Sequence, residues 1–231
     1  MKIKHIWLFI TSILYAGNAI SQDSLSIKKE KDFKILSLRL GVDLFKPIKT
    51  SIEDNFQGIE IVGDLKINRR IFIAAELGSE KKTQQTEQIN FTTNGSYIKL
   101  GVDYNFFNNW KGMDNSLFVG IRISNSIHTH KVNEYILYEN YSAVEIKNSY
   151  FERAIVKDGG LIGERGQINS NWIEVLFGTK VEVLNNFYIG ASLRIHRLLN
   201  NSQPENFGNL YAPGFNKIVD DNRFGASFNY T

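Results

Sequence analysis

Three side chains with catalytic or metal-binding chemistry stand two positions apart in one segment: Ser126, His128 and His130. Alternate residues of a β-strand share a face, so a strand here would present all three together. A serine beside a histidine is a hydrolase pair, and paired histidines occur in metal sites. No partnering carboxylate is identifiable, although Glu134 lies nearby in the chain. We favour a structural role at the rim of a β-structure.

Two other signals for chemistry are weaker. Asp220 and Asp221 form an acidic pair of a kind that acid–base catalysis uses, but their setting, VDDN, is typical of a solvated turn before a strand. His196 lies on the same polar strand face as Arg194, which indicates an interior histidine whose hydrogen bonds are made within the fold. We therefore predict no catalytic residue, no metal site and no cofactor.

The beginning of the chain indicates export. Lys2 and Lys4 precede an apolar run over residues 6–16 and a small-residue pattern at 19–21, which is typical of a cleaved signal peptide. The run is shorter than the roughly 20 residues of a spanning helix. Without the two lysines the formal charge of +3 falls to about +1, so no nucleic-acid partner is expected. The absence of cysteine excludes disulfides, thiolate metal sites and a lipid-modified cysteine.

Alternation of apolar and polar residues dominates the rest of the chain. It begins with LSLRLGVDLF at residues 36–45 and returns in YIKLGVDYNF at 97–106. This period of two predicts an all-β protein. We predict eight strands, near residues 36–45, 58–67, 70–79, 95–106, 116–128, 172–183, 187–198 and 223–231.

One face of these strands is apolar and the other carries charges of both signs. The charged face is predicted to hold Arg39, Asp43, Glu60, Asp64, Lys66, Glu76, Lys99, Asp103, Arg122, Glu174, Lys180, Glu182 and Arg194. Acidic and basic residues nearly balance, which favours a paired network over an ion pore, since a pore shows one sign of charge at its constriction. Eight strands also enclose a bore just wide enough to be filled by side chains.

The charged face is predicted to be the interior of a closed barrel. Seven strands carry glycine on that face, where a narrow interior must make room for long side chains: Gly41, Gly78, Gly101, Gly120, Gly178, Gly190 and Gly225. Long and short connections alternate along the chain, and aromatic residues gather near strand ends, as in membrane barrels. Two near-minimal turns are expected, at residues 68–69 and 185–186.

These patterns resemble the small eight-stranded outer-membrane β-barrels of Gram-negative bacteria, broadly OmpA-like or OmpX-like. The resemblance covers roughly residues 36–231. YAPGFNKIVDDNRFGASFNY and NWIEVLFGTKVEVLNNFYIGASLRIH also look like a family of exported outer-membrane-type barrels with no established activity. The resemblance implies an antiparallel up-and-down transmembrane barrel in the outer membrane, with long external loops and short periplasmic turns. The expected organisation is a signal peptide (1–21), a short periplasmic lead (22–34) and the barrel (35–231).

The last strand, with about nine residues, is short for a membrane strand, and we expect it to continue a few residues further. The longest connection, residues 131–171, leaves room for two more strands, and a barrel of ten strands is the alternative. It also holds a candidate contact patch for a partner: Tyr135, Tyr138, Tyr141, Tyr150 and Phe151. Ordinary packing of a projecting hairpin is the simpler interpretation of these aromatic residues.

Three functional hypotheses follow. The first is a non-enzymatic, monomeric outer-membrane protein that contacts lipid and has a structural or surface-interaction role, binding protein or surface partners through its loops. The second is an enzyme that modifies outer-membrane lipid, as a lipid A acyl hydrolase or transferase. The third is a soluble periplasmic barrel that binds an apolar ligand inside.

Overall fold

The structure is a computed structural model that describes residues 37–109, 114–138, 153–157, 162–203, 208–218 and 223–231. The described residues all belong to one compact unit within residues 34–231, so the predicted signal peptide and lead lie outside them. Among the described residues, none of the helices combines the length and the apolar character needed to cross a membrane.

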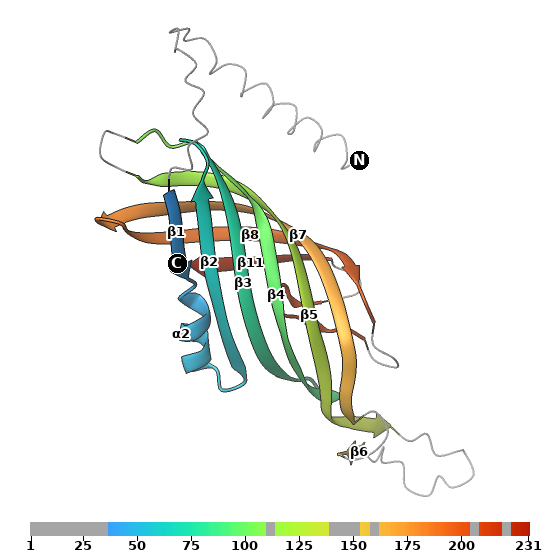
Figure 1. The fold of residues 1–231 in the computed structure, drawn as a ribbon. Helices are drawn as coiled ribbons and strands as arrows, with labels where there is room; N and C mark the ends of the chain where they lie inside the picture. The colour runs from blue at the N-terminus through green and yellow to red at the C-terminus, as the bar shows by residue number, and fades with distance from the viewer. Residues whose placement is uncertain (1–36, 110–113, 139–152, 158–161, 204–207, 219–222) are drawn as a thin grey trace, which may run out of the picture. The chain divides into compact units, whose positions relative to one another are not determined.

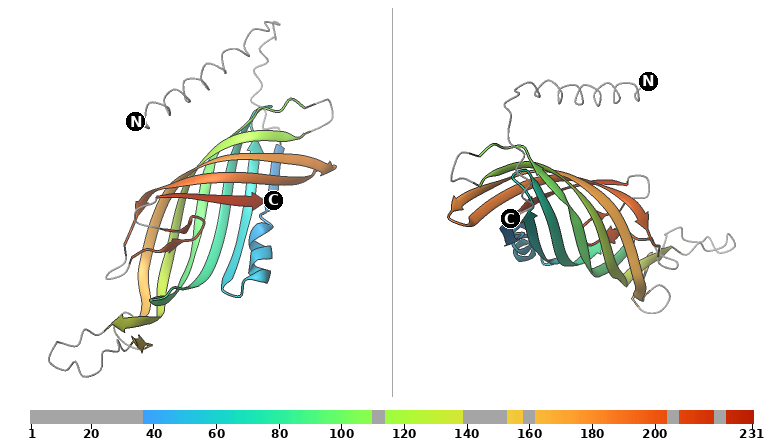
Figure 2. Two further views of the ribbon diagram at one scale, coloured as in Figure 1. Left: turned by 180° about the vertical axis from the view of Figure 1, so that it is seen from behind. Right: turned by 45° about the horizontal axis from the view of Figure 1, so that its top comes forward.

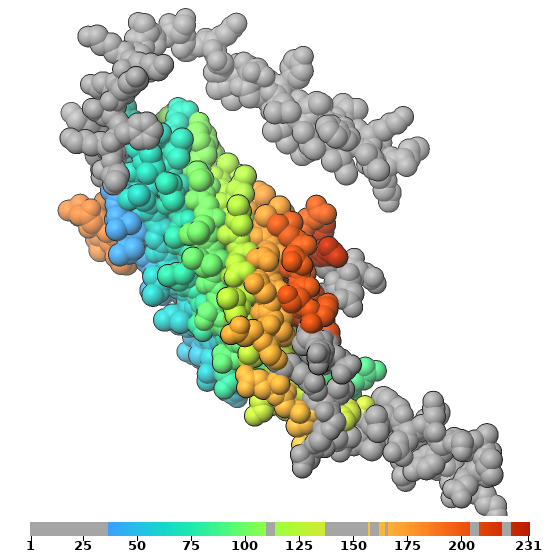
Figure 3. Space-filling model, turned by 45° about the vertical axis from the view of Figure 1, so that its right-hand side comes forward, coloured from blue at the N-terminus to red at the C-terminus, as the bar shows by residue number. Residues whose placement is uncertain are grey.

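One antiparallel sheet dominates the described chain, with the strands following one another in the order β1-β2-β3-β4-β5-β7-β8-β11 (Figure 1). A short strand, β6, pairs only with β5. The bounds are β1 (Ser37–Val42), β2 (Phe56–Lys66), β3 (Ile71–Gln85), β4 (Ile89–Asn105), β5 (Ser116–Tyr138), β6 (Arg153–Val156), β7 (Gly163–Leu184), β8 (Phe187–Asn201) and β11 (Phe224–Tyr230). Each strand of the main path overlaps one of the predicted segments, and the prediction of an all-β, antiparallel up-and-down sheet is confirmed. Figure 3 shows several of them side by side in chain order.

Both predicted short turns are present. Between β2 and β3, the Asn68 side chain accepts hydrogen bonds from the backbone N–H groups of Arg70 and Ile71, at 2.8 Å each. Between β7 and β8, Asn186 adopts a positive φ of 61°, which asparagine tolerates better than most residues. These local interactions fix the registers of the β2–β3 and β7–β8 hairpins.

Several strands run further than the sequence pattern indicated. β5 has 23 residues and β7 has 22. β3 and β4 extend through the predicted long connection and leave only residues 86–88 between them. In these extensions both faces are largely polar, so the alternation that marks a strand is lost while the backbone pairing continues.

The first connection contains a helix that the sequence analysis did not predict. The strand predicted to reach Phe45 ends at Val42, because the Asp43 carboxylate accepts the backbone N–H of Phe45 at 3.0 Å and turns the chain. Helix α2 (Phe45–Ile52) follows and exposes Phe45, Ile48 and Ile52. With only eight residues, it is too short to give a recognisable helical period.

The sheet is strongly curved (Figure 1). Its two faces carry different kinds of side chain. The convex face exposes large aliphatic side chains, among them Leu40 (76% exposed), Ile123 (69%) and Leu193 (62%). The concave face buries charged residues, of which Glu60 and Glu174 are 0% exposed. A water-soluble sheet would place these two kinds of side chain the other way round.

The two edge strands, β1 and β11, do not pair with each other as strands within the described residues. Just beyond β1, the backbone N–H of Leu44 donates to the carbonyl of Tyr230 at 2.7 Å, and the N–H of Tyr230 donates to the Asp43 carboxylate at 3.2 Å. The predicted continuous closure of the barrel is therefore reduced, in the described chain, to this contact.

The connection between β8 and β11 folds back against the concave face instead of projecting as a loop (Figure 2). It contains a small hairpin, β9 (Tyr211–Ala212) and β10 (Asn216–Lys217). We call residues 208–218 the inserted segment. Its apolar residues form a buried cluster with the sheet, comprising Tyr97, Trp172, Leu198, Ala212, Phe215 and Ile218.

Candidate functional site

The charged residues predicted to share a face lie on the concave side of the sheet. Nine of the thirteen are buried, and they are Asp43, Glu60, Asp64, Glu76, Lys99, Asp103, Arg122, Glu174 and Arg194. The other four, Arg39, Lys66, Lys180 and Glu182, are half-buried. The strands bring them together because alternate residues of neighbouring strands stack on one face.

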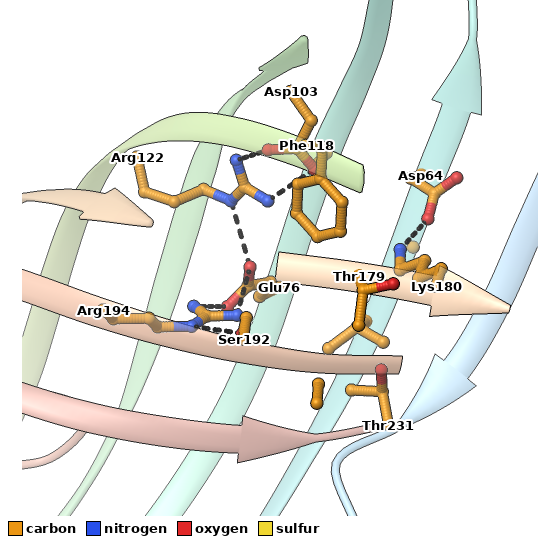
Figure 4. Close-up of a pocket in the computed structure, with 14 residues that line it drawn as sticks. Asp64, Glu76, Asp103, Phe118, Arg122, Thr179, Lys180, Ser192, Arg194 and Thr231 are labelled. Atoms are coloured by element: carbon orange, nitrogen blue, oxygen red, sulfur yellow. Dashed lines mark hydrogen bonds and ion pairs between the residues drawn. The ribbon is translucent and has the colours of Figure 1, made fainter. Parts of the chain in front are cut away.

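Glu76 on β3 is the centre of the network (Figure 4). Its carboxylate accepts from Arg194 Nη1 at 2.6 Å and from Arg122 Nε at 3.0 Å. Arg122 also donates hydrogen bonds from both terminal nitrogens to the Asp103 carboxylate, at 2.6 and 3.0 Å. Arg194 Nη1 reaches Glu174 at 3.2 Å. Strands β3, β4, β5, β7 and β8 are thus linked through one set of alternating charges.

A second part of the network surrounds Glu60 on β2. The Tyr97 hydroxyl donates to its carboxylate, and Asn229 Nδ2 on β11 donates at 2.9 Å. Lys46 of helix α2 lies 3.5 Å from the same carboxylate. Glu60 therefore joins the last strand, the helix and the middle of the sheet.

The interior is filled. The cavity lined by Glu76, Asp103 and Arg194 has a volume of about 30 Å³, which is space for one or two water molecules. Since the charges are also paired with each other, this part of the described interior offers no path for a solute.

The inserted segment is held by Glu80, which sequence analysis did not select. Its carboxylate accepts from the Tyr211 hydroxyl at 2.9 Å and from the backbone N–H of Gly214 at 3.1 Å, and it pairs with Lys46 at 2.5 Å. Burial raises the pKa of Tyr211, and the Glu80 charge raises it further. Burial disfavours the charge on Glu80, but the Lys46 charge and the hydrogen bonds from Lys46, Gly214 and Tyr211 together outweigh burial and lower the pKa of that carboxyl.

The serine and histidines singled out in the sequence do lie on one face of β5, and they contact the inserted segment. Asn209 Oδ1 lies 3.3 Å from His128 Nε2 and 2.8 Å from His130 Nε2. Asn209 Nδ2 donates to Ser170 Oγ at 3.0 Å, so the amide oxygen is oriented to accept from both rings. The Nδ1 atom of His128 then accepts from the Ser126 hydroxyl, at 3.3 Å.

This cluster is a buried structural contact. Ser126 and His130 are 0% exposed and His128 is 2% exposed. Burial lowers the pKa of His128 to about 4, against a smaller opposite effect of the Asn209 hydrogen bond. Within the described part of the chain, no group of three or more His, Cys, Asp or Glu side chains is placed to hold a metal ion.

The predicted contact patch is only partly described. Tyr135 is half-buried on β5, opposite Ile89 of β4 and Val156 of β6. Tyr138 is the last residue of β5. Tyr141, Tyr150, Phe151 and the acidic pair Asp220–Asp221 lie outside the described residues, so the patch stays a prediction.

Several residues of the interior were not predicted: Lys46, Glu80, Trp172, Asn209, Tyr211 and Asn229. Glu80 could have been found, because it continues the register of Glu76 and Gly78 by one more step. Asn209 and Tyr211 gave no such signal, since their segment has no periodicity and its inward fold depends on contacts with distant strands.

The fold and its interior define the chain as an all-β protein built on an antiparallel up-and-down sheet, apolar outside and ion-paired inside. Residues 2–231 match the family described as Domain of unknown function (DUF6048), and the chain belongs to this family. No curated protein matches the chain, and no solved structure does.

Proposed function

We propose that this protein is a small, non-enzymatic β-barrel of the Gram-negative outer membrane, with a structural or surface-interaction role. The observation that carries the proposal is the reversed polarity of the sheet. Large aliphatic side chains cover its convex face, while charged side chains are buried on its concave face. Hydrocarbon on the outside and polar groups on the inside are the arrangement expected of a membrane barrel.

The amount of exposed apolar surface supports this proposal. On β3, β4 and β5 the residues Leu77, Leu100 and Ile121 are 56%, 51% and 59% exposed. Burying one such side chain is worth about 1.5–3 kcal/mol, so a band repeated over all eight strands is costly in water. Lipid removes that cost.

The apolar band covers only part of the sheet. On β4 it runs from Ile98 to Tyr104, and on β5 from Leu117 to Ile127, where Asn125 is a polar interruption. Exposed aromatic residues, Tyr104, Phe106, Phe107 and Phe187, lie at the end with the short turns, as expected of an interfacial belt.

Beyond the band, β5 continues for eleven residues, 128–138, which is roughly 36 Å of strand. Outward positions there, such as Thr129 and Lys131, are polar. This extension is the part of the protein that stands outside the bilayer. It is the surface on which we place the interaction with protein or surface partners.

The enzymatic hypothesis receives less support. Ser126 and His128 face the concave side and are buried, whereas an enzyme acting on lipid needs access from the lipid side. We expect His128→Gln to leave lipid A acylation unchanged in cells that produce the protein. A change in the acylation pattern, seen by mass spectrometry, would favour the enzyme instead.

The hypothesis of a soluble barrel requires the apolar face to line the interior. In the described residues that face is convex and exposed, and the interior is charged. A soluble barrel also predicts recovery without detergent, which the next experiment examines.

Membrane insertion is tested by cell fractionation with a matched pair of variants on β4. Leu100 lies within the apolar band, and Asn94 is an exposed residue beyond it. Leu100→Lys should lower the amount of folded protein in the outer-membrane fraction and destabilise it by about 2–4 kcal/mol in lipid vesicles. Asn94→Lys should have little effect.

The fractionated material is also run on a gel with and without boiling. A closed membrane barrel resists SDS until it is heated, so the mobility of the wild type should change on boiling. Two results together would contradict the proposal: wild-type protein that is soluble and keeps its gel mobility on boiling, and a Leu100→Lys variant that is as stable as the wild type.

A further inference from the structure

The inserted segment contacts every histidine in the part of the chain that the structure describes. Its Asn209 binds His128 and His130, and its Phe215 ring lies 4.6 Å from the ring of His196. Histidine is the side chain whose ordinary pKa lies closest to neutral pH. The interface between the segment and the sheet therefore combines burial with groups that take up protons in mild acid.

Side chains hold the segment on the sheet. Its small strands β9 and β10 pair only with each other. Among the described residues, its backbone–backbone hydrogen bonds run from Phe215 to Ala212 and from Ile218 to Leu210, inside the segment. The hydrogen bonds that reach the sheet, such as those to Glu80, each involve a side chain. The segment can therefore leave the concave face without breaking the backbone pairing of any two strands of the sheet.

Two ionisable anchors of the segment lie on one rung of the sheet. Glu80 of β3 is opposite Gly95 of β4, and Gly95 is opposite His128 of β5. Gly95 keeps the space between them open, because a Cβ atom there would lie 2.3 Å from the Cβ of His128. Glu80 accepts from the Tyr211 hydroxyl, and His128 binds Asn209. One acid and one histidine thus hold the same part of the segment.

The surroundings of His128 disfavour a charge on its ring. On β4 and β7 the opposite residues are Gly95 and Ile168, which cannot pair with a cation. The ring centroid of His130 lies 5.2 Å away. Burial is the main reason that the pKa of His128 is lowered. The titratable and charged groups on the elements around the ring are His130 of β5, Glu80 of β3, Lys46 of α2, which pairs with Glu80, and Tyr211 of the segment.

We propose that the inserted segment is an acid-released plug, which leaves the concave face when His128 takes up a proton, while the sheet stays folded. Release admits water to the ring and solvates its charge. It also uncovers Tyr97, Trp172 and Leu198, which form the buried apolar cluster together with Phe215 and other residues of the segment. The protein then has a closed form near neutral pH and an open form in acid, with an apolar surface on its concave face.

Linked proton binding sets the direction of this change. With the segment in place the pKa of His128 is about 4, and in the released form the ring regains the ordinary value of 6.5. The released form binds the proton more tightly, so a falling pH favours it. One linked proton raises the equilibrium constant for release about 70-fold between pH 7.5 and 4.5. Neutralisation of Glu80 in stronger acid weakens the second anchor in the same direction.

Hydrogen–deuterium exchange tests the proposal, because it measures local opening separately from unfolding of the sheet. The folded protein in detergent is followed by mass spectrometry at pH 7.5, 6 and 4.5, and each rate is divided by the intrinsic rate at that pH. Corrected exchange of residues 209–218, which include the Gly214 amide bound to Glu80, should rise about 70-fold from pH 7.5 to 4.5. Exchange of residues 97–105 on β4 should stay unchanged. This outcome does not depend on insertion into a membrane.

Two histidine variants identify the proton. His128→Gln keeps an amide N–H near the position of Nε2 but cannot titrate, so exchange of the segment should be the same at all three pH values. His196→Gln alters another contact of the same segment and should keep the pH dependence. Three results would each overturn the proposal: no rise in the wild type, a rise that persists in His128→Gln, or a parallel rise on β4.

Asn209→Asp tests the charge in the opposite direction. It places a carboxylate against the protonated ring of His128, and such a pair stabilises the closed form in acid. The rise in exchange between pH 7.5 and 4.5 should therefore disappear in this variant, while β4 again stays protected. A rise as large as in the wild type would show that the charge on His128 does not release the segment.

Discussion

The hydroxyl of Tyr211 donates to the Glu80 carboxylate at 2.9 Å, and the two residues are 131 positions apart in the chain. Tyr211 belongs to the inserted segment, and Glu80 lies on β3 at the opposite side of the sheet order from β8. Together with the Gly214 N–H, which donates to the same carboxylate at 3.1 Å, this contact ties the last connection to the first half of the sheet.

Tyr211→Phe should lower the free energy of unfolding by about 2 kcal/mol, because it removes a buried hydrogen bond to a charged group. Urea unfolding in detergent micelles measures the change. Tyr104→Phe is a matched control, since the Tyr104 hydroxyl also makes one side-chain hydrogen bond, which it accepts from Arg70 at 2.9 Å, but in an exposed position. Equal losses in the two variants would contradict the role of the inserted segment.

Gly214→Ala should destabilise the protein by about 2–4 kcal/mol. Gly214 has a φ of +81°, and a Cβ atom there would lie 2.7 Å from the ring of Tyr97. Both the left-handed backbone and the close approach disfavour a side chain.

The control for this variant is Gly166→Ala, since a Cβ at Gly166 would meet nothing within 4 Å. Thermal unfolding of both variants gives the comparison. If Gly214→Ala unfolds at the temperature of the wild type, the segment does not pack against Tyr97 as described.

The sequence was informative wherever one face of a strand is apolar and the opposite face is charged. Leu100, Val102 and Tyr104 alternate with Lys99, Gly101 and Asp103, and this segment lies in β4 as predicted. The placement of the charged residues on one face followed directly, because β-structure repeats every two residues.

The sequence was uninformative where that contrast disappears. Around Lys131 and Asn169 both faces are polar, so the long ends of β5 and β7 gave no alternating signal. The inserted segment is defined by long-range contacts such as Asn209 with His128, which no local pattern encodes. Helix α2 spans only two turns, and its Phe45 and Ile48 could equally have continued a strand.

Arg194→Met should destabilise the protein strongly, by about 3–5 kcal/mol, because it removes one of the two cations that the buried carboxylates of Glu76 and Glu174 share. The other cation, Lys99, lies 3.9 Å from Glu76 and 3.1 Å from Glu174. Lys157→Met removes one side of an exposed ion pair with Glu134, at 3.8 Å, and should be indistinguishable from the wild type. The measurement is urea unfolding at neutral pH. A small loss for Arg194→Met would mean that water enters the interior and screens these charges.

The burial of His128 predicts a pH dependence of stability. Its pKa is lowered to about 4 in the folded protein, from an ordinary value of 6.5, and the residue lies on β5 beyond the apolar band. The unfolded chain therefore binds a proton between pH 6.5 and 4 that the folded protein does not bind. Stability contributed by neutral His128 is complete above pH 6.5 and is lost as the pH falls towards 4, by up to about 3 kcal/mol.

The contribution of His128 is isolated by comparing the wild type with His128→Gln, since carboxylates such as Glu80 also lose stabilisation in acid. The free energy of unfolding is measured at pH 7.5, 6 and 4.5 in the same detergent. The variant should be less stable than the wild type at pH 7.5, and the difference should shrink as the pH falls, because only the wild type loses the histidine contribution. A difference that stays constant across this range would mean that His128 is accessible to water and titrates normally. The Asn209 contact would then not exclude water from the cluster.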